Sequence, residues 1–336
     1  MKKKIAFSIL AAILLFIVFA AWKFLGPTVN APEGKFFYIA TGKPYDSVLN
    51  DLQDQKIISG RSWFDRAARI IGYKNVKAGR YEIKKEMSIV ELVRMLRNGR
   101  QTPVNFVITK LRTKESLASR IGNSFECDSI QMMQFLNNPD SLKEYNLDTN
   151  TAMAAAMPYT YIIKWNTTPT AIFKQFYTAY KTFWTDDRKQ KASSLGLSPE
   201  QAITLASIIE EETNAATDKP NVASVYLNRI AKGMPLQADP TVKFALKNFD
   251  LKRILNGHLQ TQSPYNTYTN KGLPPGPICT PSVETIDAVL NSPKTDYLYF
   301  VANSAFDGTH IFTTNYTDHI KYARLYQQEL NKRNIK

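Results

Sequence analysis

The chain has 336 residues, of which 44% are hydrophobic and 12% aromatic, so it is long enough for about two domains and too apolar to be disordered. Its formal net charge is +14, and residues 61–120 carry 15 basic against 5 acidic residues. Such a block is typical of a surface that meets anionic lipid, acidic glycan-peptide or nucleic acid, or of a basic face exposed only to solvent. The two cysteines, Cys127 and Cys279, exclude a disulfide framework and leave either one bridge or, more simply, two free thiols.

An apolar run follows a short N-terminal segment that contains three lysines. Residues 5–22 are uncharged, which is about the minimum length for a membrane-spanning helix and longer than the core of a cleavable signal peptide. Lysines before the span favour a cytoplasmic N-terminus, so the rest of the chain is expected outside the cytoplasmic (inner) membrane, away from nucleic acid. We therefore predict a cytoplasmic tail at 1–4, an uncleaved single-pass transmembrane anchor at 5–25 and a linker at 26–34.

A small α/β subdomain is predicted next, at residues 35–103. Strands are expected at 36–39 and 77–83, and helices around 47–52, 63–71 and 88–96. Ser88 and Glu91 have the spacing of a capping box, and Gly99 ends the last helix. The order Gly-x-Tyr-x-Ile, short helix, Asn-Gly is similar to LysM-like modules, which bind N-acetylated glycans. A small α/β spacer without a ligand is the alternative.

A larger mixed α/β domain is predicted at residues 104–336, which makes the whole chain α+β. It opens with a strand at 104–108, followed by two helices within 113–138 and an extended segment at 158–165. A helix with one aromatic side follows at 170–184, and a mostly polar helix closes the chain from 317 onward.

Three consecutive carboxylates stand at the end of the most clearly marked helix, residues 198–213. Ser198 is a strong N-cap, with proline in the first turn and glutamine three residues on. At about 100° per residue, Glu210 falls beside the apolar stripe, Glu211 faces away from it and Glu212 lies on its opposite flank. We therefore expect Glu211 in solvent. Partial desolvation would raise the pKa of Glu210 and keep it protonated, as a general acid requires, unless the three residues are only a surface acidic cluster.

Polar and aromatic residues follow this helix on segments that proline and glycine make rigid. A second amphipathic helix ends near Asn228, and a polar turn then carries Gln237 and Asp239. Residues 262–268 and 272–278 add serine, asparagine, threonine and tyrosine side chains, which can line a sugar groove. Rigid loops on a scaffold are where function usually resides.

Taken together, these segments resemble the YceG-like endolytic murein transglycosylases. The resemblance spans nearly the whole chain and implies a YceG-like catalytic domain at 104–336. It further implies an enzyme that cleaves the bond between N-acetylmuramic acid and N-acetylglucosamine inside glycan strands, leaves 1,6-anhydro ends and so limits strand length. The motifs that carry it lie at residues 206–213, 222–229, 233–242, 263–268, 272–278, 299–302 and 308–312.

The resemblance also implies the roles of particular residues. The family's catalytic glutamate corresponds to Glu210, which would serve in turn as acid and base because the sugar's own hydroxyl replaces water. Glu212 is expected to support Glu210. One position departs from the family pattern, since Tyr159 stands where an acidic residue is usual. The residues expected to bind substrate are Asn228, Gln237, Asp239, Ser263, Tyr265, Asn266 and Tyr268.

The partners that this hypothesis implies are peptidoglycan glycan strands, with penicillin-binding proteins of wall synthesis as further candidates. Two alternatives remain, namely a glycan hydrolase in which Asp239 acts as a second carboxylate on water, and a non-catalytic wall-synthesis scaffold. His258, His310 and His319 are the candidates for a metal site, but their spacing fits no metal motif. We therefore expect neither a metal nor a cofactor.

Overall fold

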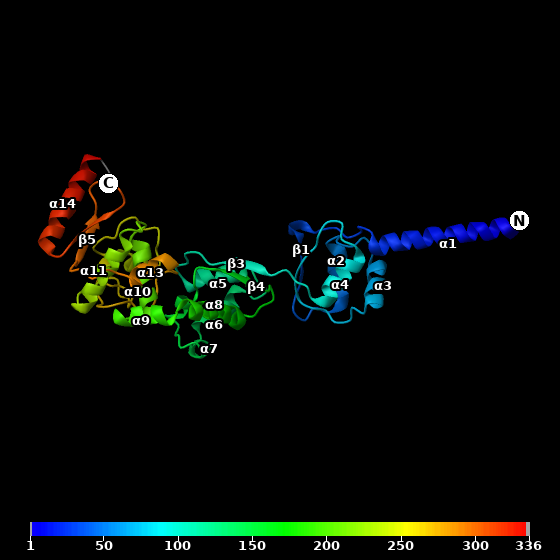
Figure 1. Ribbon diagram of the computed structural model, residues 1–336, viewed down its shortest axis with the longest axis horizontal. Helices are drawn as coiled ribbons and strands as arrows, with labels where there is room; N and C mark the ends of the chain where they lie inside the picture. Colours follow the sequence, from blue (N-terminus) through cyan, green and yellow to red (C-terminus); the bar gives the residue numbers. More distant parts are fainter. Residues whose placement is uncertain (1, 334–336) are drawn as a thin grey trace. The chain divides into compact units, whose positions relative to one another are not determined.

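The computed structural model describes residues 2–333, and its main-chain contacts divide them into two compact units (Figure 1). The N-terminal unit comprises residues up to 106 together with two later segments, 124–127 and 162–168. The C-terminal unit comprises the remainder. Cys127 of the first unit and Cys279 of the second are both buried, and neither forms a disulfide.

The chain begins with a long apolar helix, α1 (Lys2–Leu25), which contains the predicted anchor. Residues Lys3–Leu25 have a mean hydropathy of 2.7, and they are long and apolar enough to cross a membrane. At 1.5 Å per residue the helix is about 36 Å long, which exceeds the roughly 30 Å of a bilayer's hydrocarbon core. Most of its apolar side chains are exposed, as expected of a helix whose solvent is lipid.

The N-terminal unit is built around a two-stranded antiparallel sheet, in which β1 (Phe36–Ile39) pairs with β2 (Gly79–Glu82). Three helices surround it: α2 (Tyr45–Asp54), α3 (Arg61–Ile71) and α4 (Ile89–Asn98). A single 3-10 turn, η1 (Glu33–Lys35), precedes β1. The capping box of α4 and the left-handed glycine that ends it are confirmed. The shared core includes Phe37, Leu52, Phe64, Tyr81 and Leu92.

Two strands and several helices precede the centre of the C-terminal unit. The strands β3 (Val104–Val107) and β4 (Thr160–Ile163) form a second small sheet. The extended segments at 104–108 and 158–165 were predicted, but their pairing was not. The aromatic side of α8 is buried, so those rings belong to the core. The helical elements of this part are α5 (Lys114–Gly122), α6 (Ser129–Asn137), α7 (Pro139–Lys143), η2 (Ala152–Ala155), α8 (Pro169–Phe183) and α9 (Asp186–Ser194).

The centre of the C-terminal unit is α10 (Pro199–Glu212), which starts at the predicted Ser198 capping box. Every residue from 202 to 209 is buried, so the helix is enclosed on all sides and the single apolar stripe expected from the sequence is too narrow. Its neighbours include α11 (Lys219–Ala231), α12 (Asp239–Ala245) and α13 (Val283–Leu290). The turn expected at Asp239 therefore begins a short helix.

The end of the chain forms a third antiparallel pair, β5 (Tyr299–Ala302) with β6 (His310–Thr313), beside the last helix, α14 (Tyr316–Lys332). A 3-10 turn, η3 (His258–Gln260), lies in the long segment between α12 and α13. This segment is irregular but fixed by hydrogen bonds, for example those by which Asn266 holds the carbonyls of Leu259 and Thr261.

Gly276 is the position in this segment where a side chain has least room, because an added Cβ would lie 2.1 Å from the carbonyl oxygen of Asn150. We expect Gly276→Ala to lower the melting temperature by about 3–10 °C, since overpacking costs roughly 1–3 kcal/mol and each kcal/mol shifts a domain of this size by about 2–4 °C. Gly257 is the matched control, because it has open space and φ of −62°. Thermal melts followed by circular dichroism would contradict this account if the two alanine variants melted alike.

Candidate active site

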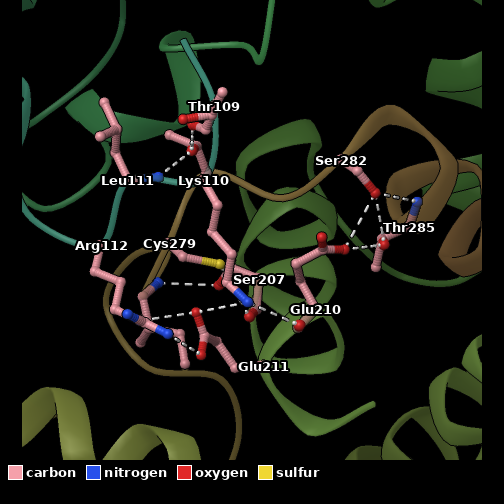
Figure 2. A network of polar contacts seen from close by, with 12 residues as sticks. Thr109, Lys110, Leu111, Arg112, Ser207, Glu210, Glu211, Cys279, Ser282 and Thr285 are labelled. Carbon is pink, nitrogen blue, oxygen red and sulfur yellow. Dashed lines mark hydrogen bonds and ion pairs between the residues drawn. The ribbon is translucent and has the colours of Figure 1, made fainter. Parts of the chain in front are cut away.

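The three carboxylates at the end of α10 point in different directions and have different partners. A helix C-terminus carries partial negative charge, so acidic side chains there need compensation. Glu210, Glu211 and Glu212 receive it from three separate parts of the C-terminal unit. Figure 2 shows the first two, with Glu210 directed toward Ser282 and Thr285 and Glu211 toward Arg112.

Glu210 is held by one ammonium group and two hydroxyls, all bonded to its Oε2 atom. Lys219 Nζ, from the first turn of α11, donates at 2.9 Å and Ser282 Oγ donates at 3.1 Å. Thr285 Oγ1, from α13, donates as well. The lysine also reaches the Thr285 hydroxyl at 2.6 Å, so the group is a connected network. Only 16% of the Glu210 side chain is exposed.

These contacts decide the charge of Glu210. Burial raises its pKa, but the hydrogen bonds from Thr285 and Lys219, together with the lysine's charge, lower it further than burial raises it. The net result is a pKa below the ordinary value, and hence an ionised Glu210 at neutral pH. The prediction of a raised pKa is therefore wrong, because the spacing of α10 does not show that Lys219 and Thr285 reach this residue.

Glu211 forms a bidentate ion pair with the guanidinium group of Arg112. Arg112 Nε and Nη2 each donate at 3.0 Å, and Lys110 Nζ lies 3.1 Å from the same carboxylate. The side chain is 14% exposed, so the expectation that Glu211 faces solvent is wrong. The reason is tertiary, since residues 109–112 cross this side of α10. The Thr280 hydroxyl holds residues 109–112 in this position by accepting a hydrogen bond from the Leu111 N–H at 2.8 Å.

Glu212 is the carboxylate with the weakest compensation. Tyr226, on α11, donates its hydroxyl at 2.7 Å. Burial raises the pKa of Glu212 to about 7, and the charge of Asp239 adds to that rise, against the opposing effects of the Tyr226 hydrogen bond, Lys243 and Arg229. The pKa of Glu212 is thus shifted toward neutral pH, in the direction opposite to that of Glu210.

Asp239 is exposed and lies close enough to Glu212 for its charge to raise the pKa of that residue. Asp239 begins α12 and accepts a hydrogen bond from the Tyr268 hydroxyl at 2.6 Å. Gln237 lies two residues earlier in a left-handed conformation, with φ of 53°, and its N–H donates to the Thr267 carbonyl at 3.1 Å. Both Gln237 and Asp239 are exposed, so their side-chain heads remain accessible to a ligand.

Two of the predicted substrate ligands instead hold the backbone. The Asn228 amide donates to the carbonyls of Thr295 and Tyr297, at 2.7 and 2.9 Å. Asn266 is buried, and its amide bonds the same loop at two carbonyls. In this conformation both amide nitrogens are committed, and their position is explained by the loops that they fix.

Ser263 and Tyr265 lie on the segment that leads to Tyr268. The Ser263 hydroxyl accepts from the Tyr265 N–H at 3.2 Å, which closes a local turn. The Tyr265 ring packs on Phe244, with centroids 4.7 Å apart. A cavity of about 180 Å³ adjoins Tyr265 and is lined also by Arg112, Lys114 and Lys247. Both residues remain partly accessible.

The residues that distinguish these carboxylates were not identified from the sequence. Lys219 starts α11 beside a proline, where a lysine side chain is usually exposed to solvent. Tyr226 is buried on the apolar side of α11, where only its ring would be expected to matter. A signal does exist for Tyr226, because a buried tyrosine usually has a hydrogen-bond partner.

Among the described residues, no group of three or more histidine, cysteine, aspartate and glutamate side chains could hold a metal ion. The three histidines lie apart in the C-terminal unit. His310 Nδ1 lies 2.9 Å from Asp218 Oδ2, His258 Nδ1 accepts from the Leu255 N–H, and His319 stacks on Tyr299. Each therefore has a local structural contact.

The C-terminal unit also holds a cavity of about 1000 Å³ along the first turns of α10. Glu200, Thr204 and residues 272–275 are among its lining. Glu212 is twelve residues further along the helix, which corresponds to about 18 Å. Glu210, Glu211 and Glu212 are not among the residues that line this cavity.

Comparison with known proteins places this arrangement in a family. Residues 37–325 match the model of the YceG-like family. The chain belongs to the YceG-like family. It is 31% identical over 323 residues to a Bacillus subtilis protein named endolytic murein transglycosylase, covering 88% of this chain and 85% of that protein. A relative with the same name from Streptococcus pneumoniae is 26% identical, and the match covers 84% of this chain but only 57% of the relative.

A solved structure supports the fold of this YceG-like protein. The crystal structure of a yceG-like protein from Listeria monocytogenes aligns with a TM-score of 0.58 at 28% identity. The alignment covers 86% of this chain and 99% of that one.

The departure at Tyr159 lies in a partly buried position, where burial raises the pKa of its phenol. The charges of Arg188 and Asp287 act on the same group.

The opposite pKa shifts of Glu212 and Glu210 predict opposite effects of neutral substitutions. Glu212 has a raised pKa in the folded state, so its contribution to stability is present at acid pH and is lost as the pH rises through about 7. We expect Glu212→Gln to raise the free energy of unfolding at pH 8 by about 2–3 kcal/mol, because one pKa unit corresponds to about 1.4 kcal/mol.

Glu210 serves as the internal comparison for that measurement. Its lowered pKa contributes stability above the ordinary carboxyl pKa, and this contribution is lost as the pH falls through the folded-state value. Glu210→Gln should therefore destabilise the protein at pH 8 and do so less at pH 4. Urea unfolding at the two pH values measures both variants, and equal signs for them at pH 8 would refute the assignment.

Proposed function

We propose that this chain is a membrane-anchored lytic transglycosylase that cleaves peptidoglycan strands internally. Membership of the YceG-like family supports this activity, as do its Bacillus and Streptococcus relatives, which are named endolytic murein transglycosylases. The bond cleaved joins N-acetylmuramic acid to N-acetylglucosamine, and the product is a 1,6-anhydro end. Such cleavage inside nascent strands limits their length.

The reaction requires one carboxyl group that acts twice. It first donates a proton to the glycosidic oxygen that leaves, and it then accepts the proton of the sugar's C6 hydroxyl as that oxygen attacks the anomeric carbon. No water enters, so the paired carboxylates of ordinary glycosidases are not needed. A pKa near the working pH suits both steps, because the group must be protonated at the start and basic afterwards.

Glu212 fits this role best, and the observation that carries the proposal is its surroundings: its one hydrogen-bond partner is the Tyr226 hydroxyl at 2.7 Å, the exposed Asp239 lies close enough to act on its charge, and burial raises its pKa to about 7. Glu210, which the sequence favours, is ionised and has one oxygen bonded to Lys219, Ser282 and Thr285. A carboxylate held in that way lacks the proton that the first step needs. In this proposal Glu210 ties α10 to α11 and α13, and so fixes the direction of Glu212.

Asp239, Gln237 and Tyr268 are proposed to meet the sugar beside Glu212. The negative charge of Asp239 favours the protonated form of Glu212 before cleavage, and it would stabilise positive charge that develops at the anomeric carbon. Tyr268 orients that carboxylate through its hydroxyl. Gln237 is exposed and carries both a donor and an acceptor, which suits an N-acetyl group. Ser263 and Tyr265 would extend the surface.

The remaining parts are proposed to bring this site to its polymer. The anchor would cross the cytoplasmic membrane once, with the N-terminus inside and the two units outside. Residues 35–103 would form a LysM-like glycan-binding subdomain and residues 104–336 the catalytic domain. The basic charge of residues 61–120 suits acidic glycan-peptides near the membrane, and penicillin-binding proteins are candidate partners there.

Separate substitutions of the two glutamates test the assignment. We expect Glu212→Gln to reduce release of fragments from purified glycan strands by about 10³-fold or more, because general acid–base catalysis contributes about 10²–10⁴-fold and here acts in both steps. Glu210→Gln should keep measurable activity, with circular dichroism to verify that both variants fold. Loss of activity in Glu210→Gln with retention in Glu212→Gln would return the catalytic role to Glu210.

Analysis of the product ends tests the type of reaction. Mass spectrometry of fragments released by the full chain in detergent should find ends that are 18 Da lighter than reducing ends, because an anhydro sugar lacks one water (about 18 Da). Reducing ends would instead favour hydrolysis, with Asp239 as the base that activates water. Absence of any fragment, with the fold intact, would favour a non-catalytic scaffold.

A further inference from the structure

The junction between α1 and the N-terminal unit is made by aromatic rings. The ring of Trp63, in the first turn of α3, lies 6.0 Å from the ring of Phe19 and 5.3 Å from that of Phe24. Phe24 also packs against the core of the unit. The unit is therefore attached along the last turns of α1, which contact both α3 and α4, and the aromatic part of this attachment is made by Trp63 of α3.

This contact fixes the level of α3 relative to a membrane that α1 spans. Phe19 lies six residues before the end of α1 at Leu25, which is about 9 Å along the helix axis. A hydrocarbon core of about 30 Å takes up about 20 residues, so Phe19 belongs to the apolar segment of the span. A side chain that touches Phe19 must then lie at the boundary between hydrocarbon and headgroups, where tryptophan is enriched.

The direction of α3 places the whole helix at about the same depth in the membrane. Figure 1 shows α3 crossing the direction of α1, next to the point at which α1 meets the unit. A helix that crosses a spanning helix runs along the membrane surface, not into or away from it. Its C-terminal residues consequently lie at a depth similar to that of Trp63.

The outer side of α3 has the composition of an interfacial helix. Phe64, Ala67 and Ala68 face the core, whereas Arg66 and Ile70 are exposed on another side. Trp63 lies at the edge between the two sides, half-buried and packed against the core. The Ile70 side chain is 79% exposed, and the Arg66 guanidinium lies over the Trp63 ring at 5.3 Å. Isoleucine and tryptophan beside arginine suit the membrane interface, where acyl chains lie next to anionic headgroups.

Basic charge gathers at the same level. Arg61 pairs with Asp46. Arg69 pairs with Asp65, but its side chain remains 81% exposed and therefore accessible to a second anion. Within the described chain, Arg66 and Lys74 have no ion pair. Near the end of α1, the Lys23 ammonium lies 5.1 Å from the centre of the Trp22 ring, in the position of a side chain that reaches up to headgroups. Anionic headgroups complement this charge, and each basic side chain near such a surface adds to binding.

We propose that α3 lies in the outer face of the membrane as an interfacial helix, with Trp63 and Ile70 among the upper acyl chains and Arg66 and Arg69 on anionic lipid headgroups. This inference rests on the proposed membrane anchor. Its consequence is that the N-terminal unit is fixed against the bilayer at two places, α1 and α3, and does not swing freely about the span.

A fluorescent label at residue 70 tests the depth of α3. The full chain is reconstituted into vesicles of 70% phosphatidylcholine and 30% phosphatidylglycerol, with the polarity-sensitive dye NBD on Ile70→Cys. Cys127 and Cys279 are buried, which directs the label to the introduced thiol. We expect blue-shifted emission and quenching by doxyl-labelled lipid. Label on Arg97→Cys, an exposed position in the last turn of α4, should stay water-like. A water-like label at both positions would overturn the proposal.

Charge substitutions test the role of anionic lipid. Arg66→Gln with Arg69→Gln is compared with Arg94→Gln with Arg97→Gln, since both pairs are exposed and have the same spacing. We expect the first pair to lower the ratio of buried to water-exposed label at residue 70 by about tenfold to thirtyfold in the anionic vesicles. The second pair should leave the ratio unchanged. Equal effects of both pairs would refute specific binding by α3.

One further measurement separates failure of this inference from failure of the anchor. Flotation of the vesicles in alkaline carbonate retains a spanning protein and releases one bound only at the surface. A chain that does not float would overturn the proposed anchor and with it the role of α3. A chain that floats with a water-like label at residue 70 would overturn α3 alone.

Discussion

Complete enclosure of α10 is the constraint on which the C-terminal unit depends. A helix with eight consecutive buried residues must have neighbours on every side, and those neighbours come from segments far apart in the chain, including residues 109–112 and α11, α12 and α13. Because the helix has no free face, its C-terminal side chains leave it in directions that the packing dictates. The positions of Glu210, Glu211 and Glu212 follow from this.

Three identical side chains acquire different chemistry from this arrangement. Glu211 is paired with the guanidinium group of Arg112. Glu210 accepts hydrogen bonds from the Lys219 ammonium group and from two hydroxyls. Glu212 is enclosed and accepts one hydrogen bond, from the Tyr226 hydroxyl. Desolvation acts against ionisation of both Glu210 and Glu212, but only at Glu210 do hydrogen bonds and a nearby cation exceed it. The same packing thus lowers the pKa of one carboxyl group and raises that of another to about 7.

The N-terminal unit shows a related dependence on a single junction. Rings of α1 and α3 meet there, so the segment that is apolar enough to cross a membrane is joined to the folded unit by packing as well as by the chain. A flexible tether would leave the orientation of the unit free. Aromatic packing restricts it, and this gives the basic residues of α3 a definite side to face.

The sequence by itself determined the helices and strands with strong local signals, the family and the stretch that carries the carboxylates, because hydrophobic period, capping residues and glycine positions are local. It did not predict α9 or α13, and it predicted a turn where α12 begins. It placed Ser198 at the start of α10 and Ser88 and Glu91 in their capping box. Only the tertiary structure decided the charges, since Lys219, Arg112, Thr285 and Tyr226 reach the helix end from other elements. A pKa depends on burial and on partners in space, and neither can be read from spacing along one helix.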